Sequence, residues 1–201
     1  MASWAELLAG AEPGEHVVEL YGQDDHRLTR NVSRYLAEGL RRGDGLVVIA
    51  TPEHTSAIAR HLEVGSGAAV VAAGAGRLVF LDAEETLARL LVDGRPDETR
   101  FRSVIGEVLG AVRARAATGS ARAFGEMVSL LWQANRHEDA ARLEALWNSV
   151  LTEYGCSLYC AYRIDLFAHP EDAAALHPIV ASHDYLLAGA STLFSSSRTR
   201  S

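Results

Sequence analysis

A set of residues suited to binding a small molecule follows the apolar runs of this sequence, at or just after the point where each run ends. Their carboxylate, imidazole and hydroxyl groups can exchange hydrogen bonds with a ligand, and their aromatic and thioether groups can contact apolar matter. Polar residues at such places are also ordinary helix caps, and large apolar ones are ordinary core residues, so both interpretations stay open. The candidates are Tyr21, Gly22, Thr51, His54, Asp82, Glu126, Met127, Trp132 and Tyr162.

The segment from Gly22 to Thr29 occupies the place where a phosphate-binding loop of the pattern G-x-x-x-x-G-K-[ST] would lie. Gly22 and Thr29 match the ends of that pattern, but Arg27 stands at its second glycine and Leu28 at its lysine. An apolar Leu cannot neutralise a phosphate, and Arg27 blocks the close backbone approach that glycine allows. All 19 basic residues of the chain are arginine. The segment is therefore a degenerate phosphate loop or an ordinary capped helix start.

Other catalytic and metal-binding patterns are missing from the sequence. It has neither a G-x-S-x-G nucleophile turn nor a G-x-G-x-x-G loop between a strand and a helix. The two cysteines, Cys156 and Cys160, are too far apart for a C-x-x-C redox pair. The histidines, among them His54, His61 and His183, show no zinc-ligand spacing. We therefore expect no catalytic residue, no metal and no cofactor.

The composition predicts a cytoplasmic protein that binds neither nucleic acid nor membrane. The chain has 201 residues, of which 48% are hydrophobic, and its formal net charge is −7. Nucleic-acid binding normally needs a basic surface, and the longest apolar stretches are far shorter than the ~20 residues that cross a bilayer. The first residues also lack the basic start and apolar core of a secretion signal.

Short apolar runs alternate with amphipathic helical patterns along most of the chain, which predicts an α/β fold. Such alternation is typical of three layers, a mostly parallel sheet with helices on both faces, whose ligands bind beyond the carboxyl ends of the strands. We expect an N-terminal extension over 1–13 with at most a short peripheral helix, one domain over 14–190 and a disordered tail over 191–201. The predicted strands are 16–21, 46–50, 77–81, 121–125 and 157–162. The predicted helices are 24–41, 51–62, 101–118 and 138–154.

An ordered series of motifs resembles the MEDS domain, the sensory domain named for methanogens, methylotrophs and the regulator DcmR. The motifs, within roughly residues 14–187, are His16 with Tyr21, Tyr35–Leu40, Gly43–Ala50, Leu81–Ala83, Asp93 to Pro96, Phe124–Met127 with Leu131 and Trp132, Leu143–Asn148 and Cys160–Tyr162. The resemblance implies a fold derived from RecA- or KaiC-like ATPases with a degenerate Walker A loop. It also implies a domain that senses small molecules, such as hydrocarbon derivatives, and that carries over no catalytic residues.

We favour a non-catalytic sensor in bacterial signal transduction or transcriptional regulation, with its ligand at the carboxyl edge of the sheet and its output in a separate kinase or transcription regulator. One alternative is a residual nucleotide-binding, ATPase-like protein, in which Arg27 or another arginine replaces the missing lysine and Glu53 and Glu126 activate water and bind a metal. Another is a module that binds a kinase or an anti-sigma-type regulator without any ligand. A homodimer is expected from the general frequency of such assemblies.

Overall fold

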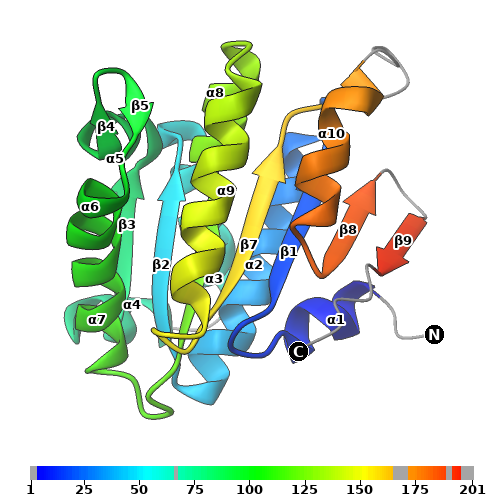
Figure 1. Ribbon diagram of the computed structural model, residues 1–201. Coiled ribbons are helices and arrows are strands. Elements are labelled where there is room, and N and C mark those ends of the chain that lie inside the picture. Colours follow the sequence, from blue (N-terminus) through cyan, green and yellow to red (C-terminus); the bar gives the residue numbers. More distant parts are fainter. Residues whose placement is uncertain (1–3, 66–67, 165–171, 189–191, 196–201) are drawn as a thin grey trace.

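The computed structural model describes the whole chain apart from residues 1–3, 66–67, 165–171, 189–191 and 196–201. Its centre is a sheet with the strand order β3-β2-β6-β7-β1-β8-β9 (Figure 1). Neighbours from β3 to β8 are parallel, and β9 is antiparallel to β8. The strands are β1 (His16–Leu20), β2 (Gly45–Ala50), β3 (Leu78–Asp82), β6 (Ala121–Gly125), β7 (Cys156–Tyr162), β8 (Tyr185–Ala188) and β9 (Thr192–Ser195). The five predicted strands and the predicted mostly parallel α/β fold are confirmed.

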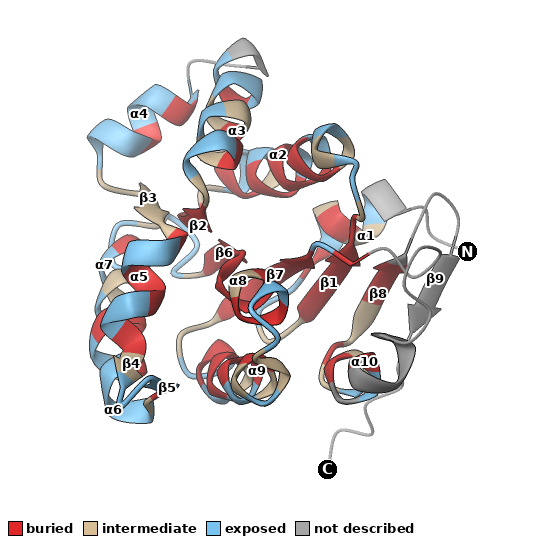
Figure 2. Cartoon of the chain, turned by 90° about the horizontal axis from the view of Figure 1, so that it is seen from above, coloured by how far each residue is buried: buried red, intermediate tan, exposed pale blue. Residues whose placement is uncertain are grey.

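Helices cover both faces of the sheet, which confirms the three-layer architecture (Figure 2). One face carries α1 (Trp4–Gly10), α2 (Asp25–Arg42), α3 (Pro52–Gly65) and α4 (Ala68–Gly74). The other carries α5 (Ala83–Leu90), α6 (Glu98–Phe101), α7 (Glu107–Arg113), α8 (Met127–Gln133), α9 (His137–Leu151) and α10 (Asp172–Ala181), with a small hairpin of β4 (Leu91–Val92) and β5 (Arg95–Pro96). Every residue of β1, β2, β6 and β7 is consequently buried.

Local sequence sets the ends of α2 and the start of α3. The carboxylate of Asp24 accepts the backbone N–H of Arg27 at 2.8 Å and caps α2, while Gly43, with φ of 86°, ends it. Thr51 accepts the backbone N–H of His54 at the start of α3, whose first residue is a proline. Both helices, and α9, agree with the predicted segments to within a few residues.

The predicted helix over 101–118 differs from the observed one. The helical segment begins at Glu98, continues through a π-helical stretch at Arg102–Gly106 and ends with α7 at Arg113. Within the stretch, Gly106 packs against Tyr154 so closely that a Cβ atom would lie 2.6 Å from the Tyr154 hydroxyl oxygen. A periodic pattern of apolar residues does not reveal such a contact, because the contact depends on a residue far along the chain.

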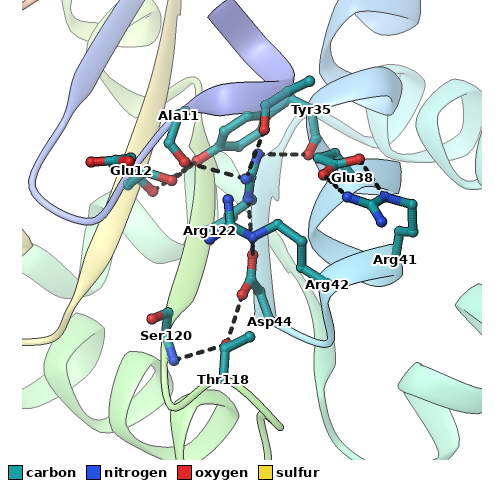
Figure 3. A network of polar contacts seen from close by, with 12 residues as sticks. Ala11, Glu12, Tyr35, Glu38, Arg41, Arg42, Asp44, Thr118, Ser120 and Arg122 are labelled. Carbon is teal, nitrogen blue, oxygen red and sulfur yellow. Dashed lines mark hydrogen bonds and ion pairs between the residues drawn. The ribbon is translucent and has the colours of Figure 1, made fainter. Parts of the chain in front are cut away.

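The N-terminal helix differs from the expected peripheral extension, because Arg122 anchors it to the core. Leu8 is fully buried. The guanidinium of Arg122, on β6, donates hydrogen bonds of 3.1–3.2 Å to the carbonyl oxygens of Leu8, Ala9 and Ala11. Its Nε donates to Oδ2 of Asp44 at 3.0 Å (Figure 3). Arg122 therefore satisfies carbonyl groups at the end of α1 that the helix leaves without partners.

The C-terminal segment is described only in part. Of the predicted disordered tail over 191–201, residues Thr192–Ser195 form β9, and the remainder lies outside the described residues. Within the described part of the chain, no helix combines the length and apolar character that a membrane-spanning segment needs.

Replacing Arg122 with Met removes the buried cation that pairs with Asp44 and the donor for the carbonyl groups at the end of α1, and it leaves Asp44 only the half-exposed Arg42, whose Nε lies 3.8 Å from Oδ2. We expect the free energy of unfolding to fall by about 3–5 kcal/mol, the usual effect of removing one partner from a buried ion pair. Urea denaturation measures the change. Arg41→Met is the matched control, because Arg41 pairs with Glu38 on the exposed side of α2 and its loss should not move the urea midpoint. An unchanged midpoint for Arg122→Met would contradict the anchoring role.

Candidate functional site

The carboxyl ends of β1, β2, β6 and β7 lie at one edge of the sheet, because these neighbouring strands are parallel. The loops and helix starts that follow them form a cleft of about 800 Å³. A cleft of this size suits a small organic molecule. Its lining residues are Tyr21, Asp25, His26, Thr29, Thr51, Glu53, His54, Ala57, Arg60, His61, Leu130, Gln133 and Arg163.

Glu126, directly after β6, joins the end of β2 to this site. Its Oε2 accepts the backbone N–H of Thr51 at 2.8 Å, and its Oε1 is hydrogen-bonded to Nδ1 of His54. Only 2% of Glu126 is exposed, so both interactions are shielded from water. The carboxylate therefore lies behind the wall of the cleft and orients the imidazole of His54.

The imidazole of His54 lies between two carboxylates. Its Nδ1 contacts Glu126, and its Nε2 lies 3.6 Å from Oδ1 of Asp25, the first residue of α2. Burial by itself lowers the pKa of His54, but the carboxylates of Glu126 and Asp25 outweigh burial and raise that pKa above its ordinary value. The positively charged imidazolium form is therefore stabilised at the cleft wall. The ring of Tyr21 meets it edge-on, with 6.0 Å between the ring centroids.

Arg163, after β7, extends this row of charges. Its Nη2 lies 3.9 Å from Oδ2 of Asp25 and donates a hydrogen bond of 3.1 Å to Oε1 of Gln23. Four groups of alternating sign thus follow one another across the strand ends, and we call Glu126, His54, Asp25 and Arg163 the charge row. Oδ1 of Asp25 makes no hydrogen bond within the described part of the chain. The side chains of Asp25 and Arg163 are 47% and 40% exposed, so this end of the row is open to a ligand.

The facing turns of α2 and α3 complete the cleft with imidazole and apolar groups. The rings of His26 and His61 meet edge-on, with 6.0 Å between their centroids. Ala57 and Leu130 are half-buried and supply apolar surface, while Arg60 is exposed. The cleft therefore combines cationic groups with a short apolar wall.

The segment that resembles a phosphate loop presents neither of its central residues to a ligand. Arg27 turns back toward the sheet, where its Nε donates to Oε1 of Glu19 at 3.1 Å and its Nη2 to the carbonyl oxygen of Leu20 at 3.1 Å. Leu28 is fully buried among core residues. Locally, the segment is a capped helix start, one of the two interpretations that the sequence left open.

One known family matches most of the chain. Residues 15–183 match the family described as MEDS, the MEthanogen/methylotroph, DcmR Sensory domain. The chain belongs to the MEDS family. The match confirms the resemblance read from the ordered motifs, and it establishes a sensory domain in general terms. No curated protein matches the chain.

Some of the predicted site residues of this MEDS domain meet at the cleft. Tyr21, Thr51 and His54 line it, and Glu126 supports it from behind. Gly22 lies in the turn before α2, where its φ of 58° suits a glycine.

The other predicted residues lie elsewhere. The carboxylate of Asp82 accepts the backbone N–H of Glu85 at 2.9 Å and caps α5. Met127, Trp132 and Tyr162 are buried in the core on the opposite face of the sheet. Their positions correspond to the cap and core interpretations that the sequence left open.

Of the residues that α2 and α3 contribute to the cleft, the predicted ligand-binding set included only His54. Asp25, His26 and Thr29 follow one face of α2, and His54, Ala57 and His61 follow one face of α3. The shared signal is a spacing of three or four residues within the first turns after a strand. A search for polar residues at this spacing would have added residues of the two helices to the candidate set, which otherwise came from the loops.

The pKa of His54 tests the charge row. Because this pKa is raised in the folded protein, the pair with Glu126 contributes stability that is complete below the unfolded pKa and is lost as pH rises through the folded pKa. In Glu126→Gln, we expect the pKa of His54 to fall, since burial and only one carboxylate remain. NMR titration of the His54 imidazole measures this pKa. Glu53→Gln, which changes an exposed carboxylate on the same helix, should leave it unchanged. An unaltered His54 titration in Glu126→Gln would contradict the arrangement.

Proposed function

We propose that this chain is a non-catalytic sensory domain that binds a small organic carboxylate in the cleft at the carboxyl edge of the sheet. The observation that carries the proposal is the charge row, in which the imidazolium of His54 and the guanidinium of Arg163 flank the half-exposed carboxylate of Asp25. A ligand carboxylate offers these two cations the same partner that Asp25 does. It can therefore replace Asp25 without leaving either cation unpaired.

The rest of the lining defines the ligand further. Arg60 adds a third cation at the exposed side of the cleft, while Ala57 and Leu130 provide apolar surface for a short alkyl chain. Such a lining favours an oxidised hydrocarbon derivative over an unsubstituted hydrocarbon. An unsubstituted hydrocarbon would displace water from the charged groups of the cleft without offering them a hydrogen-bond partner.

Displacement of Asp25 gives the domain a way to report binding. Asp25 is the first residue of α2, and the adjacent Asp24 caps that helix. A ligand that releases Asp25 from His54 and Arg163 shifts the balance between two positions of the α2 start, which is a population shift driven by differential contacts. The output would be a signalling partner, such as a kinase or a transcription regulator, that binds one of the two forms.

The nucleotide-binding alternative receives less support from these contacts. Arg27, the residue that would replace the missing lysine, is paired with the buried carboxylate of Glu19. Glu126, the acid that would bind a metal, is committed to Thr51 and His54. These contacts favour a scaffold without nucleotide chemistry, in keeping with the descent from RecA- or KaiC-like ATPases that the family resemblance implies.

Isothermal titration calorimetry with short straight-chain carboxylates and the amides of the same chain length tests the proposal. We expect saturable binding of at least one carboxylate and weaker binding of its amide. Arg163→Gln should weaken carboxylate binding by at least about ten-fold, the effect of losing one charge-assisted hydrogen bond of about 1.5–3 kcal/mol.

Arg115→Gln is the matched control, because Arg115 is exposed and lies outside the cleft. It should leave carboxylate affinity unchanged. Amides that bind as tightly as carboxylates, or no binding by either class, would contradict the proposal. Saturable binding of magnesium ATP in the same calorimeter would favour the nucleotide alternative instead.

A further inference from the structure

A second group of ionisable side chains lies inside the protein, on the sheet face that α9 covers. His16 of β1 and Cys160 of β7 meet Glu144 of α9 and His183, which lies between α10 and β8. We call these four residues the inner cluster. Each is at most 1% exposed, and one ligand atom from each lies within 4.8 Å of all the others. None of the four lines the cleft.

The ligand atoms are spaced as they would be around one small cation. Nε2 of His16 lies 3.2 Å from Sγ of Cys160 and 3.4 Å from Oε2 of Glu144. Nε2 of His183 lies 3.4 Å from Oε1 of Glu144, and Sγ of Cys160 lies 3.7 Å from Oε2 of Glu144. Ligands bound to zinc at about 2.0–2.3 Å in a tetrahedron lie about 3.3–3.8 Å apart. These four separations lie within or close to that range, and every pair of ligand atoms lies within 4.8 Å.

Neighbouring oxygen atoms set the proton positions on both imidazoles. Asn148 donates through Nδ2 to the carbonyl oxygen of Ser182 at 3.1 Å, so its Oδ1 faces Nδ1 of His16 at 2.9 Å. Nδ1 of His183 lies 2.6 Å from the carbonyl oxygen of Ile179. These oxygen atoms only accept, so each Nδ1 carries a proton, and in the neutral imidazoles each Nε2 lone pair faces the inner cluster. Histidine ligands of metal ions are oriented in the same way.

The inner cluster places several potential metal-ligand atoms close together in the protein interior, away from water. It combines a carboxylate, a thiol and two imidazole nitrogens, a set that is unfavourable unless a cation or protons neutralise it. One divalent cation, one carboxylate, one thiolate and two neutral imidazoles sum to zero charge. That sum suits a fully buried site.

We propose that the inner cluster binds one Zn²⁺ ion through both imidazole Nε2 atoms, the Cys160 thiolate and the Glu144 carboxylate. The thiol proton leaves to solvent as the zinc–sulfur bond forms, and no redox step is involved. Imidazole nitrogen and thiolate sulfur are common zinc ligands, and a closed set of four protein ligands is typical of structural zinc sites. Calcium and magnesium prefer oxygen ligands throughout, so this donor set disfavours them.

The ion would join segments that lie far apart in the sequence. β8 pairs with β1, and His183 precedes β8 by two residues. Zinc would therefore hold the connection between α10 and β8 against β1, β7 and α9. Tyr162 supports the site, because its hydroxyl donates to Oε1 of Glu144 at 2.7 Å and orients the carboxylate.

Metal titration of the full chain tests this proposal. The protein is stripped with a chelator, desalted and titrated with Zn²⁺ alone and with Co²⁺ alone. We expect one ion per chain, a thiolate-to-cobalt charge-transfer absorption band, and a higher thermal midpoint with zinc. Cys160→Ser should abolish the band and weaken zinc binding by at least about ten-fold.

The chain offers matched controls for two ligands. Cys156 lies on the same strand and is equally buried but outside the inner cluster, so Cys156→Ser should keep the band and the zinc affinity. His177 is exposed on α10, and His177→Gln controls His183→Gln in the same way. If Cys160→Ser does not fold, the cobalt spectrum of the unaltered chain and His183→Gln decide the test.

Three results would overturn the proposal. The first is less than one zinc ion bound per unaltered chain at saturation. The second is a cobalt complex without the thiolate band. The third is an equal loss of zinc affinity in the control variants Cys156→Ser and His177→Gln.

Discussion

A sheet covered by helices on both faces has no wet surface, so each charged or polar side chain on its strands must find a partner inside the protein. Arg122 on β6 finds Asp44 and the carbonyl groups at the end of α1. Glu19 on β1 finds Arg27 and Asn31 of α2. Through the α1 carbonyl groups and the α2 side chains, these two strand residues fix the positions of the helices that pack above them. Apolar packing alone would tolerate small sliding movements that these directional bonds resist.

The same constraint explains why chemistry gathers at the edge of the sheet. At that edge the strands end, so a charged side chain can form an ion pair with a protein group and still contact water. Glu126 lies on the inner side of that boundary and Asp25 on the outer side, with His54 between them. The boundary falls at the end of β7, where the hydroxyl of Tyr162 donates to the buried carboxylate of Glu144 and the next residue, Arg163, lines the cleft.

Five of the strands could be predicted because their signal is local, a short apolar run bounded by glycine or polar residues. β8 (Tyr185–Ala188) was not predicted. The short helices α5 and α8 could not be predicted, since each begins directly after a strand and has too few turns to show a period. Part of the candidate site could be predicted from the sequence, because Thr51 and His54 follow a strand. The cleft residues of α2 could not, because finding them requires knowing which face of the helix points to the cleft. The inner cluster could not be predicted from the sequence, because the pairing of β1 with β8 is what brings His16 and His183 together.

Glu19 bears on what this scaffold can bind. It is fully buried, and burial raises its pKa even though hydrogen bonds from Tyr159 and Asn31 and the charge of Arg27 oppose that rise. A phosphate at the start of α2 would need Arg27 to leave this carboxylate, and breaking a buried ion pair typically costs about 3–5 kcal/mol. That cost would offset most of the gain from one charge-assisted contact with a phosphate, about 1.5–3 kcal/mol. The pairing of Arg27 with Glu19, like the leucine at the lysine position, therefore disfavours the binding of a phosphate at the start of α2.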